Sequence, residues 1–126
     1  RVRATIQPES PNGVILAHGG NKEGYSLYLR QGRITVATCV SWKRTIISAS
    51  LAEGMRQVEF FWQKNGEMLL KVDGKLASRG KSPGFLSAQP GDSVQIGSDL
   101  IQPVGDYRVQ NAFRGTISAV SLDYSR

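Results

Sequence analysis

Apolar and polar residues alternate in short segments along most of the chain. The clearest stretch is 58–77, VEFFWQKNGEMLLKVDGKLA, where two segments carry apolar side chains at every second position. Such alternation is typical of a strand with one buried face. Asn65-Gly66 and Asp73-Gly74 lie between the segments, and both dipeptides favour tight turns because they tolerate positive φ. The stretch therefore predicts three antiparallel strands joined by two turns.

The same pattern predicts strands in the rest of the chain, at residues 1–6, 13–20, 25–30, 33–40, 45–51, 93–97 and 113–124. Pro-, Gly- and Asn-rich turns separate them. No segment keeps a helical period, and Gly54 interrupts the one short candidate helix. About ten short strands predict an all-β fold, a two-sheet antiparallel β-sandwich of jelly-roll type. A chain of 126 residues is large enough for one such domain, residues 1–126.

Two segments near the C-terminus depart from simple alternation. Apolar residues in the last strand lie first three and then two positions apart, which predicts a β-bulge near Ser118-Ala119. Before that strand, residues 99–111 are rich in polar and turn-forming side chains, and they predict a long polar loop.

The net charge of the chain indicates which classes of molecule it could bind. The chain has 16 Lys and Arg residues against 10 Asp and Glu, a formal net charge of +6, which attracts polyanions. The closest basic pairs are Lys43-Arg44 and Arg79 with Lys81, and the other cations are scattered. Without a basic cluster or a nucleic-acid-binding motif, we expect no nucleic-acid partner. The longest apolar run, Val14–Ala17, is too short for a membrane span.

Four ordered motifs resemble the laminin-G-like, concanavalin-A-like jelly roll. They are Gly13-Val14-Ile15-Leu16-Ala17, Gly24-Tyr25-Ser26-Leu27-Tyr28-Leu29, Leu70-Lys71-Val72-Asp73-Gly74 and Phe113-Arg114-Gly115-Thr116-Ile117-Ser118-Ala119-Val120. In that family a leucine-x-valine-asparagine-glycine strand precedes a closing phenylalanine-x-glycine-x-isoleucine strand. Asp73 replaces the asparagine here and preserves the turn chemistry.

The chain is also similar to the C-terminal module of bacterial arylsulfatases. Gly13–Gly20, Gly24–Tyr28 and the set Gly97, Asp99, Pro103 and Val104 match its motifs. The resemblance implies an accessory module excised from a larger sulfatase-like chain, with an adjoining catalytic domain as partner and a periplasmic or extracellular location. The sulfatase nucleophile motif needs a proline two residues after its Cys or Ser, whereas Cys39 is followed by Val40-Ser41.

The sequence offers no arrangement for catalysis. Jelly-roll glycosidases place two carboxylates on one strand face, whereas Glu59 and Glu67 each lack a second carboxylate two residues away. His18 has no evident nucleophile and acid partners and is expected to be structural. Cys39, in an alternating strand, is expected to be buried rather than reactive. We therefore predict that this domain is not an enzyme.

Calcium is a candidate ligand by resemblance. Laminin-G-like domains often hold calcium at the rim of the sandwich with two aspartates and backbone carbonyls. Asp92, Asp99 and Asp106 lie in the loops around residues 93–97 and would supply the oxygen ligands that calcium prefers. Aspartate is also common in turns for local hydrogen bonding, so both interpretations stay open.

Carbohydrate is the ligand that the aromatic and basic residues favour. Trp42, Tyr28 and Tyr107 have polar neighbours and could stack on sugar rings. Trp42 precedes Lys43-Arg44, and an aromatic ring beside two cations suits a sulfated glycan, to which Arg79 and Lys81 could also contribute. The alternative is a structural domain that packs on a catalytic domain and binds no free ligand. The sequence leaves this choice open.

Overall fold

The computed structural model describes residues 1–86, 94–99, 104–107 and 111–123. Within them it contains strands and no helix, so none that could cross a bilayer. The strands are β1 (Val2–Pro8), β2 (Gly13–Gly19), β3 (Glu23–Arg30), β4 (Arg33–Val40), β5 (Lys43–Ser50), β6 (Arg56–Trp62), β7 (Glu67–Val72), β8 (Lys75–Lys81), β9 (Gln95–Ile96) and β10 (Gly115–Leu122).

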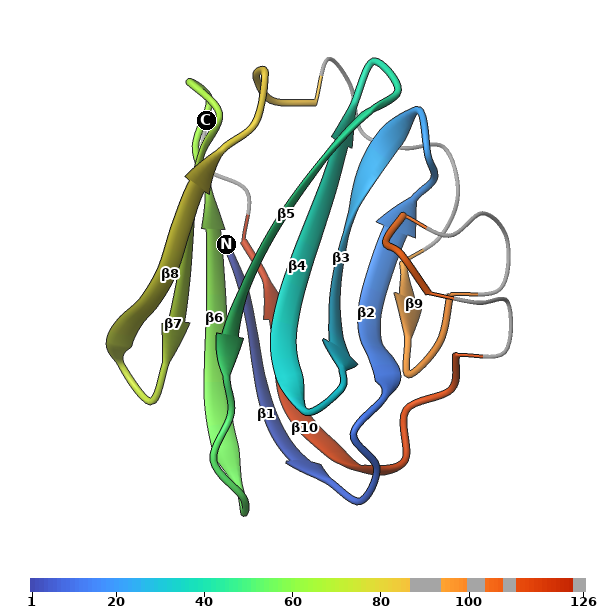
Figure 1. Cartoon of the computed structure of the whole chain (residues 1–126), viewed down its shortest axis with the longest axis vertical. Coiled ribbons are helices and arrows are strands. Elements are labelled where there is room, and N and C mark those ends of the chain that lie inside the picture. Colours follow the sequence, from blue (N-terminus) through green and yellow to red (C-terminus); the bar gives the residue numbers. More distant parts are fainter. Residues whose placement is uncertain (87–93, 100–103, 108–110, 124–126) are drawn as a thin grey trace.

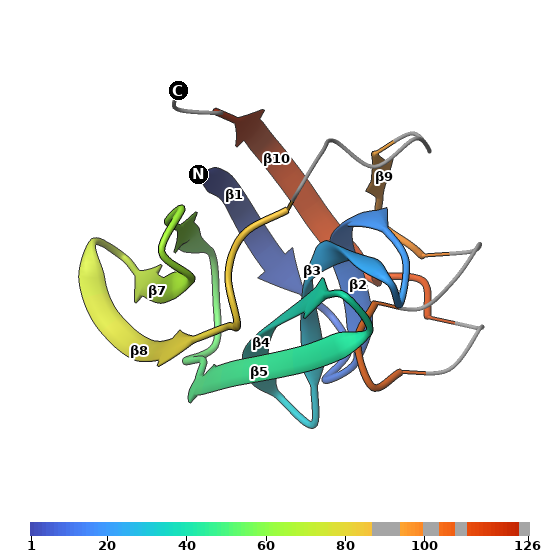
Figure 2. The ribbon, with the colours of Figure 1, turned by 90° about the horizontal axis from the view of Figure 1, so that it is seen from above.

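These strands form two antiparallel sheets of five. The β1 sheet has the order β10-β1-β6-β7-β8, and the β3 sheet has the order β5-β4-β3-β2-β9. The sheets lie face to face, with β5 and β8 on one side of the sandwich (Figures 1 and 2). The predicted all-β jelly-roll sandwich is confirmed.

The main core lies between the two sheets and follows the alternation of the sequence. Its fully buried members, with at most 2% of their surface exposed, include Ala4, Ile6, Ile15, Leu16, Leu27, Ile34, Val36, Val58, Phe60, Met68 and Leu70. Each large aliphatic side chain removed from water contributes about 1.5–3 kcal/mol. The side chains on the inner faces of both sheets therefore pack against one another and are not accessible to a ligand. Residues that bind a ligand must lie on the outer faces of the sheets or at the ends of the strands.

A second, smaller core covers part of the outer face of the β3 sheet. It contains Val14, Ala17, Tyr28, Ala37, Cys39 and Val104, with Tyr107 packed against it. Val104 is completely buried and Asp99 is 1% exposed. The predicted polar loop at 99–111 thus includes residues that are packed on the sheet, because small side chains such as Ala17 and Ala37 leave room for them.

Three two-residue turns have positive φ at both positions, the geometry of type I′ hairpins. They are Gln31-Gly32 (52° and 76°), Ser41-Trp42 (49° and 70°) and Asp73-Gly74 (50° and 82°). The Asn65-Gly66 turn differs from the simplest expectation, because only Gly66 has positive φ, at 94°. The Gly66 amide donates to the Gln63 carbonyl at 2.8 Å, closing a longer loop between β6 and β7.

The predicted bulge near Ser118-Ala119 is confirmed. Arg3 pairs with Ser121 and Thr5 with Ser118, so Ala4 lies opposite two residues, and Ala119 has φ of 51°.

Several predicted strand boundaries shift. The last strand spans Gly115–Leu122 rather than 113–124, and the strand expected at 93–97 is observed at Gln95–Ile96, with residue 93 outside the described residues. β5 begins at Lys43, two residues earlier than predicted, which makes Lys43 and Arg44 strand residues.

Two leucines on neighbouring strands test the core. Leu70 is fully buried, whereas Leu76 is 51% exposed. Leu70→Ala should lower the free energy of unfolding by about 2–5 kcal/mol because it leaves a cavity. The matched change Leu76→Ala should alter it by no more than about 0.5 kcal/mol. Urea unfolding measures both values, and equal losses would contradict the assigned core.

Candidate binding surface

The turn between β4 and β5 presents the most exposed large apolar side chain in the described part of the chain. Trp42 is 65% exposed. Its left-handed backbone conformation, φ of 70°, is one that costs a residue with a side chain about 1–2 kcal/mol. The other two type I′ turns place glycine at the same position, Gly32 and Gly74. The backbone conformation of Trp42 therefore destabilises the folded chain, and the exposed side chain gains little from packing to compensate.

Two hydrogen bonds fasten this turn to the connection between β2 and β3. The Trp42 amide donates to the Lys22 carbonyl at 3.1 Å, and the Ser41 amide donates to Glu23 Oε2 at 2.8 Å. Lys22 is thereby brought beside Trp42, and Lys43 and Arg44 follow Trp42 as the first two residues of β5, with side chains on alternate faces of the sheet. All four residues are exposed. These four residues form the Trp42 rim.

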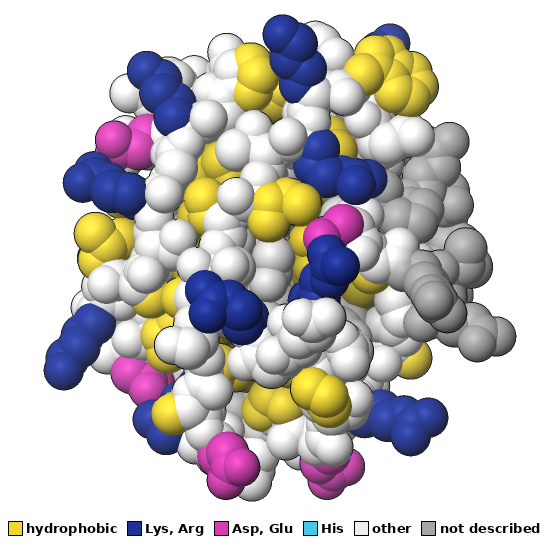
Figure 3. All heavy atoms as spheres, viewed as in Figure 1, with side chains coloured by type: hydrophobic (Ala, Val, Ile, Leu, Met, Phe, Trp, Pro, Cys, Tyr) yellow, Lys and Arg dark blue, Asp and Glu magenta, His cyan; other side chains and the backbone are white. Residues whose placement is uncertain are grey.

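The Trp42 rim combines one aromatic ring with three cations. One carboxylate lies at the same turn, that of Glu23, whose Oε2 accepts from the Ser41 amide at 2.8 Å. On the face where β4 and β5 lie in front, Lys and Arg side chains outnumber the Asp and Glu side chains that lie between them (Figure 3). The rim is thus suited to an anion that also offers an apolar face.

Lys22 was not among the residues predicted to bind a ligand, and the predicted Arg79 and Lys81 lie apart from the Trp42 rim. Arg79 and Lys81 lie on β8, in the other sheet, where Arg79 Nη2 is 3.5 Å from Glu67 Oε2 and Lys81 is opposite Glu67 in register. The structure therefore does not place Arg79 and Lys81 in the Trp42 rim. The local sequence around Lys22 could not predict its position beside Trp42. That position arises because the β2–β3 connection and the β4–β5 turn lie next to each other at one end of the sheet.

Tyr28 is not the exposed aromatic residue that the sequence predicted. It is completely buried, and its ring packs edge to face with Tyr107 at 4.8 Å between centroids. The Tyr28 hydroxyl donates to Asp106 Oδ1 at 2.5 Å, and the half-buried Tyr107 bonds to Asp99 and Ser26. Burial raises the pKa of both phenols, which keeps them neutral donors. The two tyrosines therefore attach residues 104–107 to the sheet.

The aspartates predicted to bind calcium have structural partners. Asp99 Oδ2 accepts from the Val104 amide at 3.1 Å, while its Oδ1 is buried without a partner among the described residues. Asp106 forms an ion pair with Arg30, which neutralises its charge. Asp92 lies outside the described residues. The described part of the chain contains no group of three metal-binding side chains, and a single unoccupied Asp99 oxygen makes at most part of a site. Calcium stays a prediction.

Other candidate reactive groups also have structural surroundings. His18 Nδ1 lies 3.1 Å from the Tyr25 hydroxyl, and Glu59 lies within 3.5 Å of Arg1 and Arg3. Cys39 is 1% exposed, as predicted. Burial raises the pKa of its thiol, so the thiol is protonated rather than nucleophilic.

A family model for the laminin G domain matches residues 6–124. The chain belongs to the laminin G domain family. The predicted laminin-G-like resemblance is confirmed, and laminin G domains are non-catalytic and bind carbohydrates or other proteins.

Solved structures agree with this family in fold. Domains LG4-5 of the mouse laminin alpha1 chain match with a TM-score of 0.72 and 16% identity, over 94% of this chain and 34% of that one. The LG1-3 region of the laminin alpha2 chain matches with a TM-score of 0.68 and 13% identity, over 95% of this chain and 22% of that one. No protein with a curated description matches the sequence. This laminin G domain thus spans about a third or less of those structures.

The strain at Trp42 can be measured through stability. Trp42→Gly should raise the free energy of unfolding by about 1 kcal/mol, because glycine adopts positive φ freely and the exposed ring contributes little packing. The melting temperature should rise by roughly 4 °C.

The matched control is Gly32→Ala, at the equivalent turn position, where an added Cβ has no atom within 4 Å. It should lower stability by about 1 kcal/mol through backbone strain alone. A Trp42→Gly variant that melts at a lower temperature than wild type would mean that the ring stabilises the folded chain.

Proposed function

We propose that this laminin G domain is a recognition module that binds sulfated carbohydrate through the Trp42 rim. The observation that carries the proposal is the exposed Trp42, held in an unfavourable backbone conformation beside three cations. A strained residue at an exposed position that adds little packing is explained by contact with a partner.

The chemistry of the rim fits such a ligand. An indole ring stacks on the apolar C–H face of a sugar, while the ammonium groups of Lys22 and Lys43 and the guanidinium of Arg44 form charge-assisted hydrogen bonds with sulfate oxygens. The attraction is electrostatic and surface-exposed, so added salt should weaken it.

The sequence resemblance to the C-terminal module of arylsulfatases favours sulfate as the anion. We propose accordingly that the domain is part of a periplasmic or extracellular sulfatase-like protein and holds sulfated substrate near an adjoining catalytic domain. The competing function is docking on that catalytic domain, with the Trp42 rim as the contact and no free ligand. These functions differ in whether the isolated domain binds sugar.

Heparin-affinity chromatography of the isolated domain tests the proposal. Wild type should be retained and should elute with salt. Trp42→Ala should fold normally and elute earlier. The double change Lys43→Gln and Arg44→Gln should weaken affinity about tenfold, or about 1.4 kcal/mol.

The matched control is the double change Arg79→Gln and Lys81→Gln, which removes the same charge from the other sheet and should have a smaller effect. Equal losses in the two double variants would contradict a specific rim. Absence of retention, both with calcium and with a chelator, would favour the docking function.

A further inference from the structure

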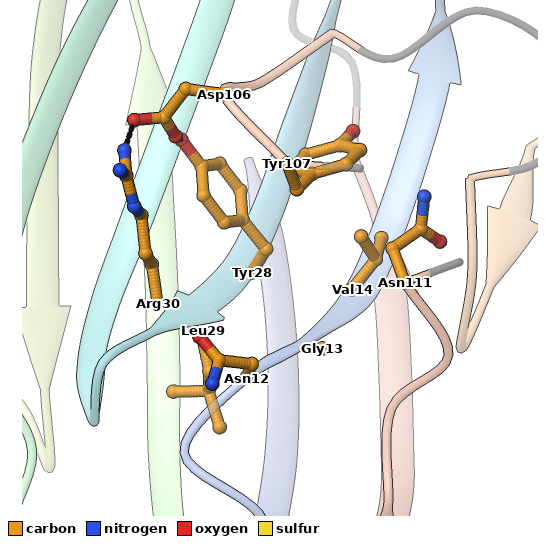
Figure 4. Close-up of a pocket in the computed structure, with 9 residues that line it drawn as sticks. All are labelled: Asn12, Gly13, Val14, Tyr28, Leu29, Arg30, Asp106, Tyr107 and Asn111. Carbon is orange, nitrogen blue, oxygen red and sulfur yellow. Dashed lines mark hydrogen bonds and ion pairs between the residues drawn. The ribbon is translucent and has the colours of Figure 1, made fainter. Parts of the chain in front are cut away.

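A pocket of about 350 Å³ opens on the outer face of the β3 sheet, at the end away from the Trp42 rim (Figure 4). Such a volume is at the lower end of the range for small-molecule sites, about 300–1,000 Å³. The pocket lies near Arg30, and the rim lies near Lys22 and Glu23. At about 3.3 Å per residue along β3, the two are roughly 20 Å apart.

The residues that line this pocket come from the β3 sheet and from the residues that pack on its outer face. Gly13, Val14 and Tyr28 belong to β2 and β3, whereas Asp106, Tyr107 and Asn111 belong to the segment packed over them. Figure 4 shows Tyr28, Tyr107 and Val14 side by side along the pocket, with Asp106 and Arg30 at one end.

Hydrogen bonds fix the covering segment to the sheet. The Val14 amide donates to the Asn111 carbonyl at 2.8 Å, and the Asn111 side chain makes two 2.7 Å bonds with the backbone of Asp99. The tyrosine hydroxyls bond Asp106 and Asp99. The pocket is therefore formed before any ligand enters, which lowers the entropy cost of binding.

Among the described residues that line the pocket, Arg30 and Asp106 are the only charged ones, and they form an ion pair. The Arg30 side chain is 50% exposed and that of Asp106 is 29% exposed. Asp106 accepts from Tyr28 through Oδ1 and pairs with Arg30 through Oδ2. A guanidinium has five N–H donors and a carboxylate about four acceptor positions, so both groups keep capacity for a ligand.

We propose that this pocket binds one neutral sugar unit, with adjacent hydroxyls bridging Arg30 and Asp106. A sugar hydroxyl both accepts and donates, so it can accept from the Arg30 guanidinium and donate to the Asp106 carboxylate. The half-buried Tyr107 ring provides apolar contact for the C–H groups of the sugar. An anion is disfavoured, because it would lie beside the negatively charged carboxylate of Asp106. The pocket and the Trp42 rim share no residues, so ligand binding at one can be tested separately from ligand binding at the other.

Chemical-shift titration of the 126-residue chain with methyl β-D-galactopyranoside and methyl α-D-mannopyranoside tests the proposal. At least one sugar should shift the amide signals of Gly13, Val14 and Arg30 with a millimolar Kd, and the signals of Lys22 and Trp42 should stay unchanged. The variant Arg30→Gln should weaken this binding about tenfold. Arg33→Gln is the matched control, because Arg33 lies directly opposite Arg30 in register and does not line the pocket.

Asp106→Asn separates sugar from anion recognition. It should also weaken sugar binding about tenfold, whereas at an anion site it would free Arg30 and strengthen the binding of sulfate or acetate. Absence of shifts with both sugars, equal effects of Arg30→Gln and Arg33→Gln, or tighter anion binding in Asp106→Asn would each overturn the proposal. If Asp106→Asn does not melt cooperatively, the Arg30 and Arg33 variants decide the question.

Discussion

The packing between the two sheets is the constraint on which the rest of the molecule depends. Every second side chain of β1, β3, β4, β6 and β7 is used to fill the space between them. Because neighbouring side chains on a strand point to opposite faces, the residues between these positions are directed outward. The outer face of the β3 sheet is divided between a covered part, under residues 104–107, and the open Trp42 rim at the end of β4.

Most of the fold followed from local patterns in the sequence. Alternation located the strands, and Asp73-Gly74 forms the tight turn expected of it. The bulge at Ala119 was predicted from the change in spacing of the apolar residues in the last strand. Strand ends were less accurate, since β5 extends to Lys43 only because it continues pairing with β4 up to the turn.

The candidate sites depend on contacts between residues far apart in the chain, which local patterns do not encode. Tyr28 is covered by Asp106 and Tyr107, which lie about 80 residues later in the chain. The polar residues next to Tyr28 in the sequence therefore led to the wrong prediction that its ring is exposed. Arg79 and Lys81 resemble Lys43 and Arg44 in sequence but lie on the other sheet. Trp42 was singled out for its neighbours, whereas its strained backbone became evident only in the structure.

Protection of Trp42 from a neutral quencher tests the central claim most directly. Trp42 is 65% exposed, whereas Trp62 is half-buried and donates its indole N–H to Ser82 at 3.0 Å. Acrylamide should therefore quench mainly Trp42. A sulfated heparin tetrasaccharide should reduce that quenching saturably, and an unsulfated hyaluronan tetrasaccharide should have a much smaller effect. Unchanged quenching with saturating heparin tetrasaccharide would contradict a carbohydrate site at the Trp42 rim.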